Sequence, residues 1–442
     1  MPNFGRVATV LGLILSWGTA GAAITVTLDV IVSGSTAIPG GTGTFRYLSE
    51  PSIEDGIIAF VGSNDAFDTG VYLWKSGNLQ AVADDTDPGP GSSSNFAAFG
   101  FPVVANGAVL FPASVAGTAQ FSGVYRFSGG SLTTVVDSSA ALPGLAEILP
   151  LSHVAARGSG LFVQSVSDFK GYVVRLTPGP AGAIAFYGDP APGGGTFGTF
   201  RRASTDGTEV SFITGLQGTS TNVLIVSDAG ALSAIAAPGT PLPNGQLEAL
   251  TPNRIHSHGG GEVAFIGKPV GLPDSLYVWK NWQIRLVVEG TETPSGGGAF
   301  EDLASVAVSE DGDLAFVGYA GLYVQSGDQR QEVLNTATQL NGHRVSGIYL
   351  GPSGISNNVV TVKVLLDGNE ELIVRIPYTV SQASAGGGGG GGVDPWTLML
   401  LAAVFRKSLR RTRAPSPPDF TCNPGPTPDR TVFSGMSNST PP

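Results

Sequence analysis

The sequence has few of the residues that cross-link or charge a protein. Its single cysteine is Cys422, close to its last residue, so the preceding chain cannot form an internal disulfide and must be stabilised by packing. Only 13% of its 442 residues are charged, and acidic residues exceed basic ones for a formal net charge of -11. Because phosphate binding requires a basic surface, we expect no nucleic-acid partner.

The sequence also lacks the common catalytic motifs. It contains no G-x-S-x-G nucleophile elbow, no Walker loop and no H-E-x-x-H zinc motif. Its four histidines lie in distant segments, at His153, His256, His258 and His343. We therefore predict no catalytic residue and no catalytic cofactor, although a site assembled from several distant loops would leave no local motif.

What the sequence does have is a repeat of about 51 residues, present in seven copies from near its start to about residue 378. One marker of each copy is an apolar residue in its second predicted strand: Phe60, Phe111, Phe162, Phe212, Phe265, Phe316 and Val362. A second marker follows it: Tyr72, Tyr125, Val173, Leu224, Tyr277, Tyr323 and Ile373. With 64 glycines and 31 prolines in the chain, this spacing predicts short strands, tight turns and propeller blades.

Residues 45–96 show the unit most clearly, with four predicted antiparallel strands separated by turn residues. These strands are Phe45–Ile53, Ile57–Val61, Gly70–Lys75 and Leu79–Asp84. The last unit provides only three strands, whereas Leu28–Ser33 has the spacing of a fourth strand without a unit of its own. We therefore predict an all-β, seven-bladed β-propeller of four-stranded blades, closed by the N-terminal strand, with an open solenoid as the alternative.

The two ends of the chain carry transport signals. Residues 1–22 have a basic residue, an apolar stretch and a small-residue cleavage site, which is typical of a signal peptide removed by signal peptidase. Residues 381–392 form a glycine-rich linker that ends in Gly391 and Gly392. Residues 393–413 combine Asp394, Pro395, a short apolar segment and a basic cluster that includes Arg410 and Arg411.

This tail resembles the GlyGly-type C-terminal sorting signals of Gram-negative bacteria, which rhombosortases process. With the unit DGIIAFVGSNDAFDTGVYLWKSGNLQAVADDTDP, it resembles an uncharacterised family of exported bacterial repeat proteins over about residues 24–413. The resemblance implies export to the cell surface or medium and a transient membrane association of the tail. Residues 414–442 depart from it as a Pro-, Ser- and Thr-rich extension that we expect to be disordered. We assign the propeller to residues 23–380.

Three sequence features qualify as candidate sites, each with a structural alternative. The acidic groups Asp84, Asp85, Asp87 and Glu310, Asp311, Asp313 offer oxygen ligands for Ca²⁺, although acidic residues are also common in hairpin turns. His256 and His258 would share one face of a strand, but the adjacent glycines favour a solvated turn. Trp74-Lys75 and Trp279-Lys280 would suit sugar stacking, but packing between blades is the favoured interpretation.

Two functions remain open from the sequence. The favoured one is a non-enzymatic binding or scaffold protein whose loops, such as Gly62–Thr69 and Ala113–Phe121, contact a protein or polysaccharide. The alternative is an extracellular hydrolase or lyase that cleaves polysaccharide or peptide. A cluster of histidine, arginine, tyrosine and carboxylate side chains near the propeller axis would favour the enzyme.

Overall fold

The computed structural model describes residues 23–118, 121–137, 150–165, 171–177, 181–251, 254–294, 299–300, 302–319 and 321–381. Every regular element in these ranges is a β-strand, so the all-β prediction is confirmed for them. None of the described residues forms a helix long and apolar enough to cross a membrane. All of the described residues belong to one compact unit.

The signal peptide, the sorting residues and the C-terminal extension lie outside the described residues. The sorting residues outside the described ranges are Gly391, Gly392, Asp394, Pro395, Arg410 and Arg411. Their assignments stay predictions.

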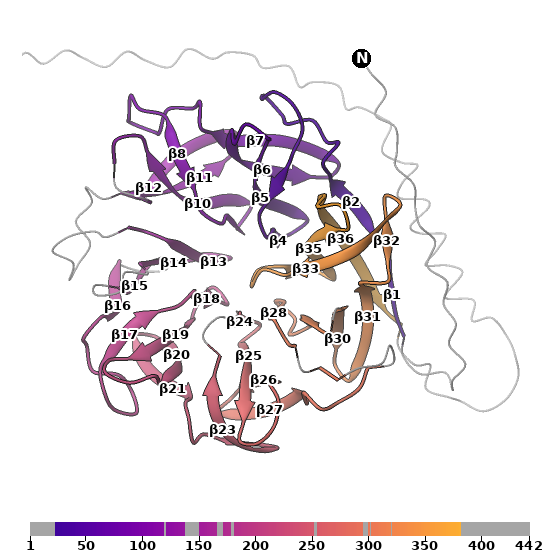
Figure 1. Ribbon diagram of the computed structural model, residues 1–442. Helices are drawn as coiled ribbons and strands as arrows, with labels where there is room; N and C mark the ends of the chain where they lie inside the picture. The colour runs from indigo at the N-terminus through magenta and orange to yellow at the C-terminus, as the bar shows by residue number, and fades with distance from the viewer. Residues whose placement is uncertain are drawn as a thin grey trace, which may run out of the picture. The chain divides into compact units, whose positions relative to one another are not determined.

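The strands form small antiparallel sheets, each built mainly from strands that follow one another in the chain (Figure 1). The first three sheets contain β3 (Tyr47–Leu48), β4 (Ser52–Glu54), β5 (Ile57–Ser63), β6 (Thr69–Lys75) and β7 (Asn78–Asp84); β8 (Phe96–Phe99), β9 (Val103–Ala105), β10 (Ala108–Val115), β11 (Gly123–Ser128) and β12 (Ser131–Asp137); and β13 (His153–Arg157), β14 (Gly160–Ser165), β15 (Tyr172–Thr177) and β16 (Gly182–Phe186).

The next three sheets contain β17 (Phe197–Phe200), β18 (Ser204–Thr205), β19 (Val210–Leu216), β20 (Asn222–Asp228) and β21 (Ala231–Ala236); β22 (Pro241–Leu242), β23 (Gly245–Leu250), β24 (Ser257–Gly259), β25 (Glu262–Pro269), β26 (Ser275–Lys280) and β27 (Gln283–Val288); and β28 (Ser305–Val308), β29 (Leu314–Gly318), β30 (Gly321–Ser326) and β31 (Gln329–Asn335). The sheet formed by the last unit contains β32 (Gln339–Leu340), β33 (His343–Tyr349), β34 (Ile355–Ser356), β35 (Val359–Leu366) and β36 (Glu371–Val380), together with β1 (Ile24–Val26) and β2 (Asp29–Val32).

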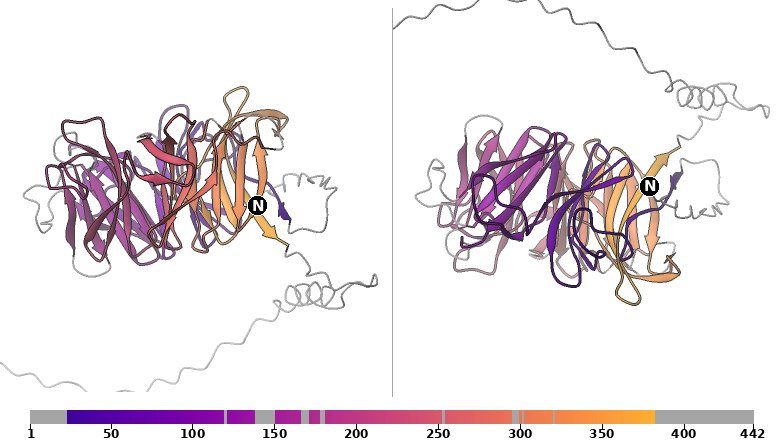
Figure 2. Two further views of the ribbon diagram at one scale, coloured as in Figure 1. Left: turned by 90° about the horizontal axis from the view of Figure 1, so that it is seen from below. Right: turned by 90° about the horizontal axis from the view of Figure 1, so that it is seen from above.

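The sheets stand side by side around a common axis, which confirms a propeller arrangement (Figures 1 and 2). Their innermost strands contact one another in chain order: β4 with β9, β9 with β13, β13 with β18, β18 with β24, and β24 with β28. The strand β34 of the last unit contacts β4 of the first. We call the end of the axis where turns join these innermost strands to the second strands the turn end, and the opposite end the loop end.

The predicted first strand of the unit is interrupted. We expected one strand over Phe45–Ile53, but β3 and β4 pair separately with β5. Pro51 lies in the gap and has no backbone N–H to donate to a ladder. The hydroxyl of Ser49 accepts a hydrogen bond from the Val61 amide there, at 2.9 Å. The prediction of four continuous strands is therefore wrong for this unit, although its other three strands match closely.

The N-terminal strand pairs with the C-terminal unit. In β2, Val30 lies opposite Val374 of β36, and Asp29 lies opposite Arg375. The Arg375 guanidinium contacts the Asp29 carboxylate at 2.9 Å. The two ends of the repeat array are thus joined in one hydrogen-bonded sheet.

The repeat markers are core residues. Phe60 and Tyr72 lie directly opposite each other on β5 and β6, and their ring centroids are 5.8 Å apart. Phe45 packs edge-on against Tyr72, with centroids 4.8 Å apart, and all three side chains are buried. The same trio recurs as Phe96, Phe111 and Tyr125, and as Phe300, Phe316 and Tyr323. The period therefore follows from packing, because the marker positions are filled by buried apolar side chains, which form an aromatic trio in these three units.

Candidate functional site

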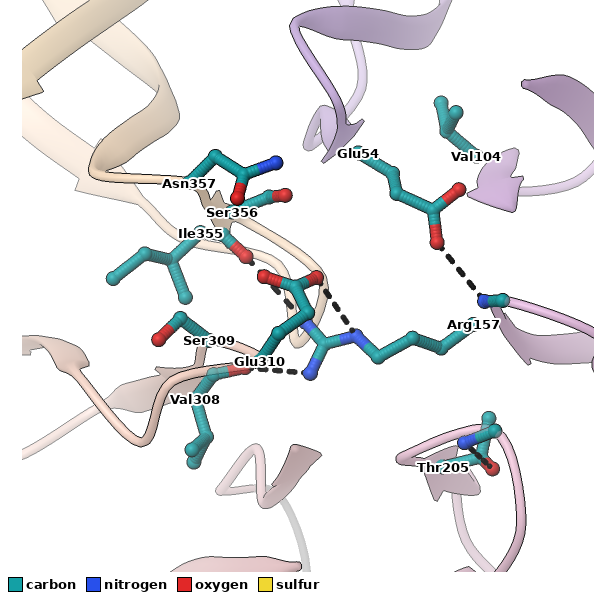
Figure 3. Close-up of polar contacts among 12 residues, drawn as sticks. Glu54, Val104, Arg157, Thr205, Val308, Ser309, Glu310, Ile355, Ser356 and Asn357 are labelled. Atoms are coloured by element: carbon teal, nitrogen blue, oxygen red, sulfur yellow. Dashed lines mark hydrogen bonds and ion pairs between the residues drawn. The ribbon is translucent and has the colours of Figure 1, made fainter. Parts of the chain in front are cut away.

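Arg157 occupies the turn end of the axis. It is the last residue of β13, and its side chain is only 9% exposed. Its Nη1 atom donates to the Val308 carbonyl at 2.9 Å, and its Nη2 atom donates to the Ile355 carbonyl at 3.4 Å (Figure 3). Its Nε atom lies 3.4 Å from Glu310 Oε1. The His258 carbonyl also accepts from Nη1, at 3.5 Å. One guanidinium thus links β13 to three other sheets, through the carbonyls of His258 in β24, Val308 in β28 and Ile355 in β34.

Two glutamates accompany this guanidinium. Glu310 pairs with it, and Glu54 accepts a hydrogen bond from the Gly158 amide at 2.9 Å (Figure 3). Burial raises the pKa of Glu54, against the opposing effect of its backbone hydrogen bonds. Burial lowers the pKa of Arg157, and Glu310 counteracts this most strongly. An arginine remains a cation under such conditions, so the turn end holds a buried charge network.

Serine hydroxyls join neighbouring innermost strands. Ser52 accepts a hydrogen bond from the Val104 amide at 3.0 Å, and Ser257 accepts one from the Val308 amide at 3.0 Å. Ser204 accepts the amide hydrogen of His258 at 2.9 Å. These hydrogen bonds hold neighbouring innermost strands together and thereby position the side chains at the turn end.

Beside this network, Asp206, Glu209 and His258 converge from two neighbouring sheets. The turn from β18 to β19 carries Asp206 and Glu209, and β24 carries His258. Asp206 Oδ2 lies 3.6 Å from His258 Nε2, and Glu209 Oε2 lies 3.8 Å from the same nitrogen. Asp206 Oδ1 accepts three hydrogen bonds of 2.9 Å within the turn, from the amides of Thr208 and Glu209 and from the Thr208 hydroxyl. The turn therefore holds the other oxygen, Oδ2, toward the imidazole.

The imidazole of His258 is buried and neutral. Its side chain has no exposed surface, and neither ring nitrogen has a hydrogen-bond partner among the described residues. Burial lowers the pKa of His258 to about 4, while Asp206 acts in the opposite direction. Burial also raises the pKa of Glu209, and Asp206 adds to that effect. At neutral pH, the contacts of His258 with the carboxylates are therefore not ion pairs.

Asp206 and Glu209 also line a hollow of about 360 Å³ between the two sheets. Asp228 and Ser233 line it on one side, and Trp279, Asn281 and Trp282 line it on the other. The hollow thus combines carboxylates with indole rings, one of which projects into solvent. It opens at the turn end of the molecule, because Trp282 lies in the turn between β26 and β27.

Trp282 has an unusual backbone conformation. Its φ is 65° and that of Asn281 is 50°, both in the left-handed region. The equivalent turn position is glycine in three other units, at Gly77, Gly130 and Gly230, which also have positive φ, whereas it is Asp328 in the turn between β30 and β31. A tryptophan there is strained, and 73% of its surface is exposed. Its ring meets Trp279 edge-on, with centroids 5.6 Å apart. Neither strain nor exposure stabilises the fold, and the contact with Trp279 is the ring packing that Trp282 makes among the described residues.

The loop end of the axis has a second, smaller cavity of about 30 Å³. Arg202 is its main polar side chain, and it contacts Glu50 at 3.1 Å and lies 4.5 Å above the Phe101 ring. His153 lines the same cavity. Burial, assisted by Arg202, lowers the pKa of His153 to about 4. The volume suits water molecules rather than a polysaccharide.

The structure does not bring the predicted acidic groups together as one site. The carboxylate of Asp84 accepts hydrogen bonds from Thr86, and that of Asp87 accepts one from the Asp84 amide. Asp85 accepts one from the Thr69 amide, at 3.1 Å. In the other group, Glu310 pairs with Arg157, Asp313 accepts the Tyr378 hydroxyl at 2.6 Å, and Asp311 is exposed. Calcium binding at either group stays a prediction.

The expectation of a solvated turn at His256 and His258 is wrong. Both are buried, because β24 is an innermost strand enclosed by its neighbours. Trp279 is buried in the core between two sheets, as the packing interpretation predicted. Sequence reasoning missed Arg157, Asp206, Glu209 and Trp282. A signal was available only for Trp282, which stands where three other units have glycine.

Residues 18–156 match a family described as "Family of unknown function (DUF7453)". No match was found among curated proteins. Among solved structures, the chain is similar to a puromycin-hydrolyzing peptidase from Mycobacterium tuberculosis (12% identity, TM-score 0.45), with 74% of this chain and 53% of that one covered, so the chain spans about half of that protein. It is also similar to an oligogalacturonate lyase in complex with manganese (10% identity, TM-score 0.44, 82% and 99% covered) and to the polysaccharide lyase Uly1 (10% identity, TM-score 0.43, 78% and 92% covered).

Proposed function

We propose that this chain is an exported binding protein that holds a polysaccharide in the hollow beside Trp282. The observation that carries the proposal is the strained, exposed indole of Trp282 at a turn position that is glycine in three other units. A left-handed backbone costs a non-glycine residue about 1–2 kcal/mol. A stabilising substitution is therefore readily available at this position, and a ligand contact explains why tryptophan stands there instead.

The lining of the hollow suits sugar chemistry. An indole offers an apolar face on which the C–H face of a sugar ring packs. The carboxylates of Asp206, Glu209 and Asp228 accept hydrogen bonds, which sugar hydroxyls donate. A volume of about 360 Å³ is within the range of small-ligand sites. This surface lies at the turn end, opposite the loops Gly62–Thr69 and Ala113–Phe121 that the sequence favoured.

We also propose how the sheets are arranged as blades. We take the sheets as the blades of a closed seven-bladed propeller in which β2 completes the blade of β33, β35 and β36. The pairing of β2 with β36 and the contact of β34 with β4 support closure. A closed ring leaves no long exposed strand edge, which benefits a protein outside the cell.

The ligand class can be tested by titrating the full chain with soluble polysaccharides and with basic and neutral peptides in a calorimeter. We expect saturable binding of at least one polysaccharide, with little dependence on salt, because stacking and short-range hydrogen bonds to an uncharged sugar are weakly screened. Binding of basic peptides alone, weakening strongly with salt, would instead identify a protein ligand held by the acidic surface and would refute the polysaccharide proposal.

A second candidate function is an extracellular hydrolase or lyase. The convergence of His258, Asp206 and Glu209 near the axis favours it, since these groups serve in acid–base catalysis. We rank it second because the charged groups next to this cluster, Arg157 and Glu310, are paired with each other in the fold and are not directed at a substrate. Turnover of a polysaccharide that Glu209→Gln abolishes, with binding retained, would establish the enzyme instead.

Export and processing rest on the sequence alone. We propose that signal peptidase removes residues 1–22 and that a rhombosortase then cleaves near Gly391 and Gly392, releasing the propeller to the surface or medium of a Gram-negative bacterium. Mass spectrometry of the extracellular fraction tests this proposal. A mature protein that still contains Arg410 and Cys422 would contradict the cleavage of the tail.

A further inference from the structure

The cluster of Asp206, Glu209 and His258 leaves a buried imidazole without a partner. His258 has no exposed side-chain surface, and neither of its ring nitrogens has a hydrogen-bond partner among the described residues. A buried polar group left in this state destabilises the fold. The turn that carries Asp206 and Glu209 brings two carboxylates to this nitrogen but places neither within hydrogen-bonding distance.

The spacing of the three groups matches a shared cation. Asp206 Oδ2 and Glu209 Oε2 lie 3.6 Å and 3.8 Å from His258 Nε2, and one atom from each residue lies within 4.8 Å of the others. Bonds of about 2.1 Å to a tetrahedral metal place ligand atoms about 3.4 Å apart. A cation between the three atoms would therefore give the imidazole a partner with only small shifts.

We propose that Asp206 Oδ2, Glu209 Oε2 and His258 Nε2 bind a divalent first-row transition metal ion, such as Zn²⁺ or Mn²⁺. An imidazole with two carboxylates suits these ions, whereas Ca²⁺ takes six to eight oxygen ligands and Mg²⁺ keeps most of its waters. This inference stands on its own and does not require the proposed polysaccharide.

The surroundings of the cluster support a cation. The three hydrogen bonds to Asp206 Oδ1 orient the carboxylate, as outer contacts commonly do for metal ligands. The His258 backbone is held at both ends, by Ser204 at its amide and by Arg157 at its carbonyl. Burial and the charge of Arg157 lower the pKa of His258, and the carboxylates of Glu310, Glu54 and Asp206 oppose that charge.

The metal would also face the hollow. Asp206 and Glu209 line both the cluster and the hollow, so three protein ligands leave coordination positions open on that side. Water or a hydroxyl of a bound ligand would fill them. The site would then resemble an open rather than a closed structural metal site.

The test is calorimetric titration of the full chain, stripped with a chelator, with Zn²⁺, Mn²⁺, Mg²⁺ and Ca²⁺ separately and without polysaccharide. We expect one Zn²⁺ or Mn²⁺ per chain and a rise in melting temperature by mass action. Glu209→Gln and Asp206→Asn should each weaken the affinity about tenfold or more. Glu209 is 27% exposed, so its variant should fold even if His258→Gln does not.

Two variants serve as matched controls. Asp65→Asn removes an exposed carboxylate at the loop end, away from the cluster, and His256→Gln removes a buried imidazole of the same segment as His258. Both should leave the affinity unchanged within about threefold. Cys422 is present in the parent and in every variant, so its thiol cannot produce a difference in affinity between them. Equal affinity in Glu209→Gln and the parent, or binding of Ca²⁺ or Mg²⁺ alone, would overturn the proposal.

Discussion

The Nε atom of Arg157 lies 3.4 Å from Oε1 of Glu310, in a contact between two sheets at the turn end of the axis. The same guanidinium binds carbonyl oxygens of Val308 and Ile355. Its position makes it the polar link between the third unit and the last two units of the repeat.

Arg157→Ala should destabilise the fold. It would remove the guanidinium that Val308, Ile355 and His258 carbonyls accept from, and it would leave the half-buried Glu310 without its partner. Breaking a fully buried pair costs about 3–5 kcal/mol, and we expect a smaller loss here because the Glu310 side chain is 35% exposed. Urea denaturation followed by circular dichroism measures the free energy of unfolding. The double variant Arg157→Met with Glu310→Gln should recover part of the loss, and a single variant as stable as the parent would show that the pair is not structural.

Removal of residues 24–34 should weaken the ring. The deletion takes away β1 and β2 and leaves the β36 edge unpaired, which favours aggregation. We expect a lower melting temperature and a larger particle size by light scattering. A truncated protein that melts like the parent and stays monodisperse would contradict closure by the N-terminal strand.

His153 should make stability depend on pH. Its pKa is lowered to about 4 in the fold, from an ordinary value of 6.5, by burial and by Arg202. Above pH 6.5 the imidazole is neutral in both states, so the full stability is present. As pH falls from 6.5 toward 4, the unfolded state takes up the proton first, and stability declines by at most about 1.4 kcal/mol per pH unit.

The measurement is the difference in unfolding free energy between the parent and His153→Gln from about pH 7 to about pH 4. The variant should lose less stability than the parent over this interval. Parallel pH profiles would show that His153 is protonated as readily in the fold as in the unfolded chain.

Much of the fold could be read from the sequence because each unit must fill the same space. The positions of Phe60 and Tyr72 recur as buried apolar residues because each unit must fill its sheet interface, and the spacing predicted β5, β6 and β7 to within two residues at each end. The interruption of the first strand was not predicted, although Pro51 and the polar residues Ser49, Glu50 and Ser52 around it offered a signal in the sequence.

The candidate site could not be predicted in the same way. Arg157 binds carbonyls of units far along the chain, and Asp206 meets His258 only because neighbouring sheets place their turns together. Such contacts leave no spacing signal. Trp282 is the exception, since a bulky residue replaces glycine at a repeated turn position and is visible once the turns are compared.

The role of Trp282 in polysaccharide binding is tested most directly by comparing Trp282→Gly with Phe67→Gly. The two residues are matched: Trp282 is 73% exposed with φ of 65°, and Phe67 is 69% exposed with φ of 66°, at the loop end. Glycine suits either backbone, so neither variant should lose much stability.

Calorimetric titration of both variants with the polysaccharide that the parent binds is the decisive measurement. We predict that Trp282→Gly weakens binding about tenfold or more, because it removes a large apolar contact, whereas Phe67→Gly leaves the affinity unchanged. Retained affinity in Trp282→Gly, with loss in Phe67→Gly, would contradict binding at the hollow and place the ligand at the loop end.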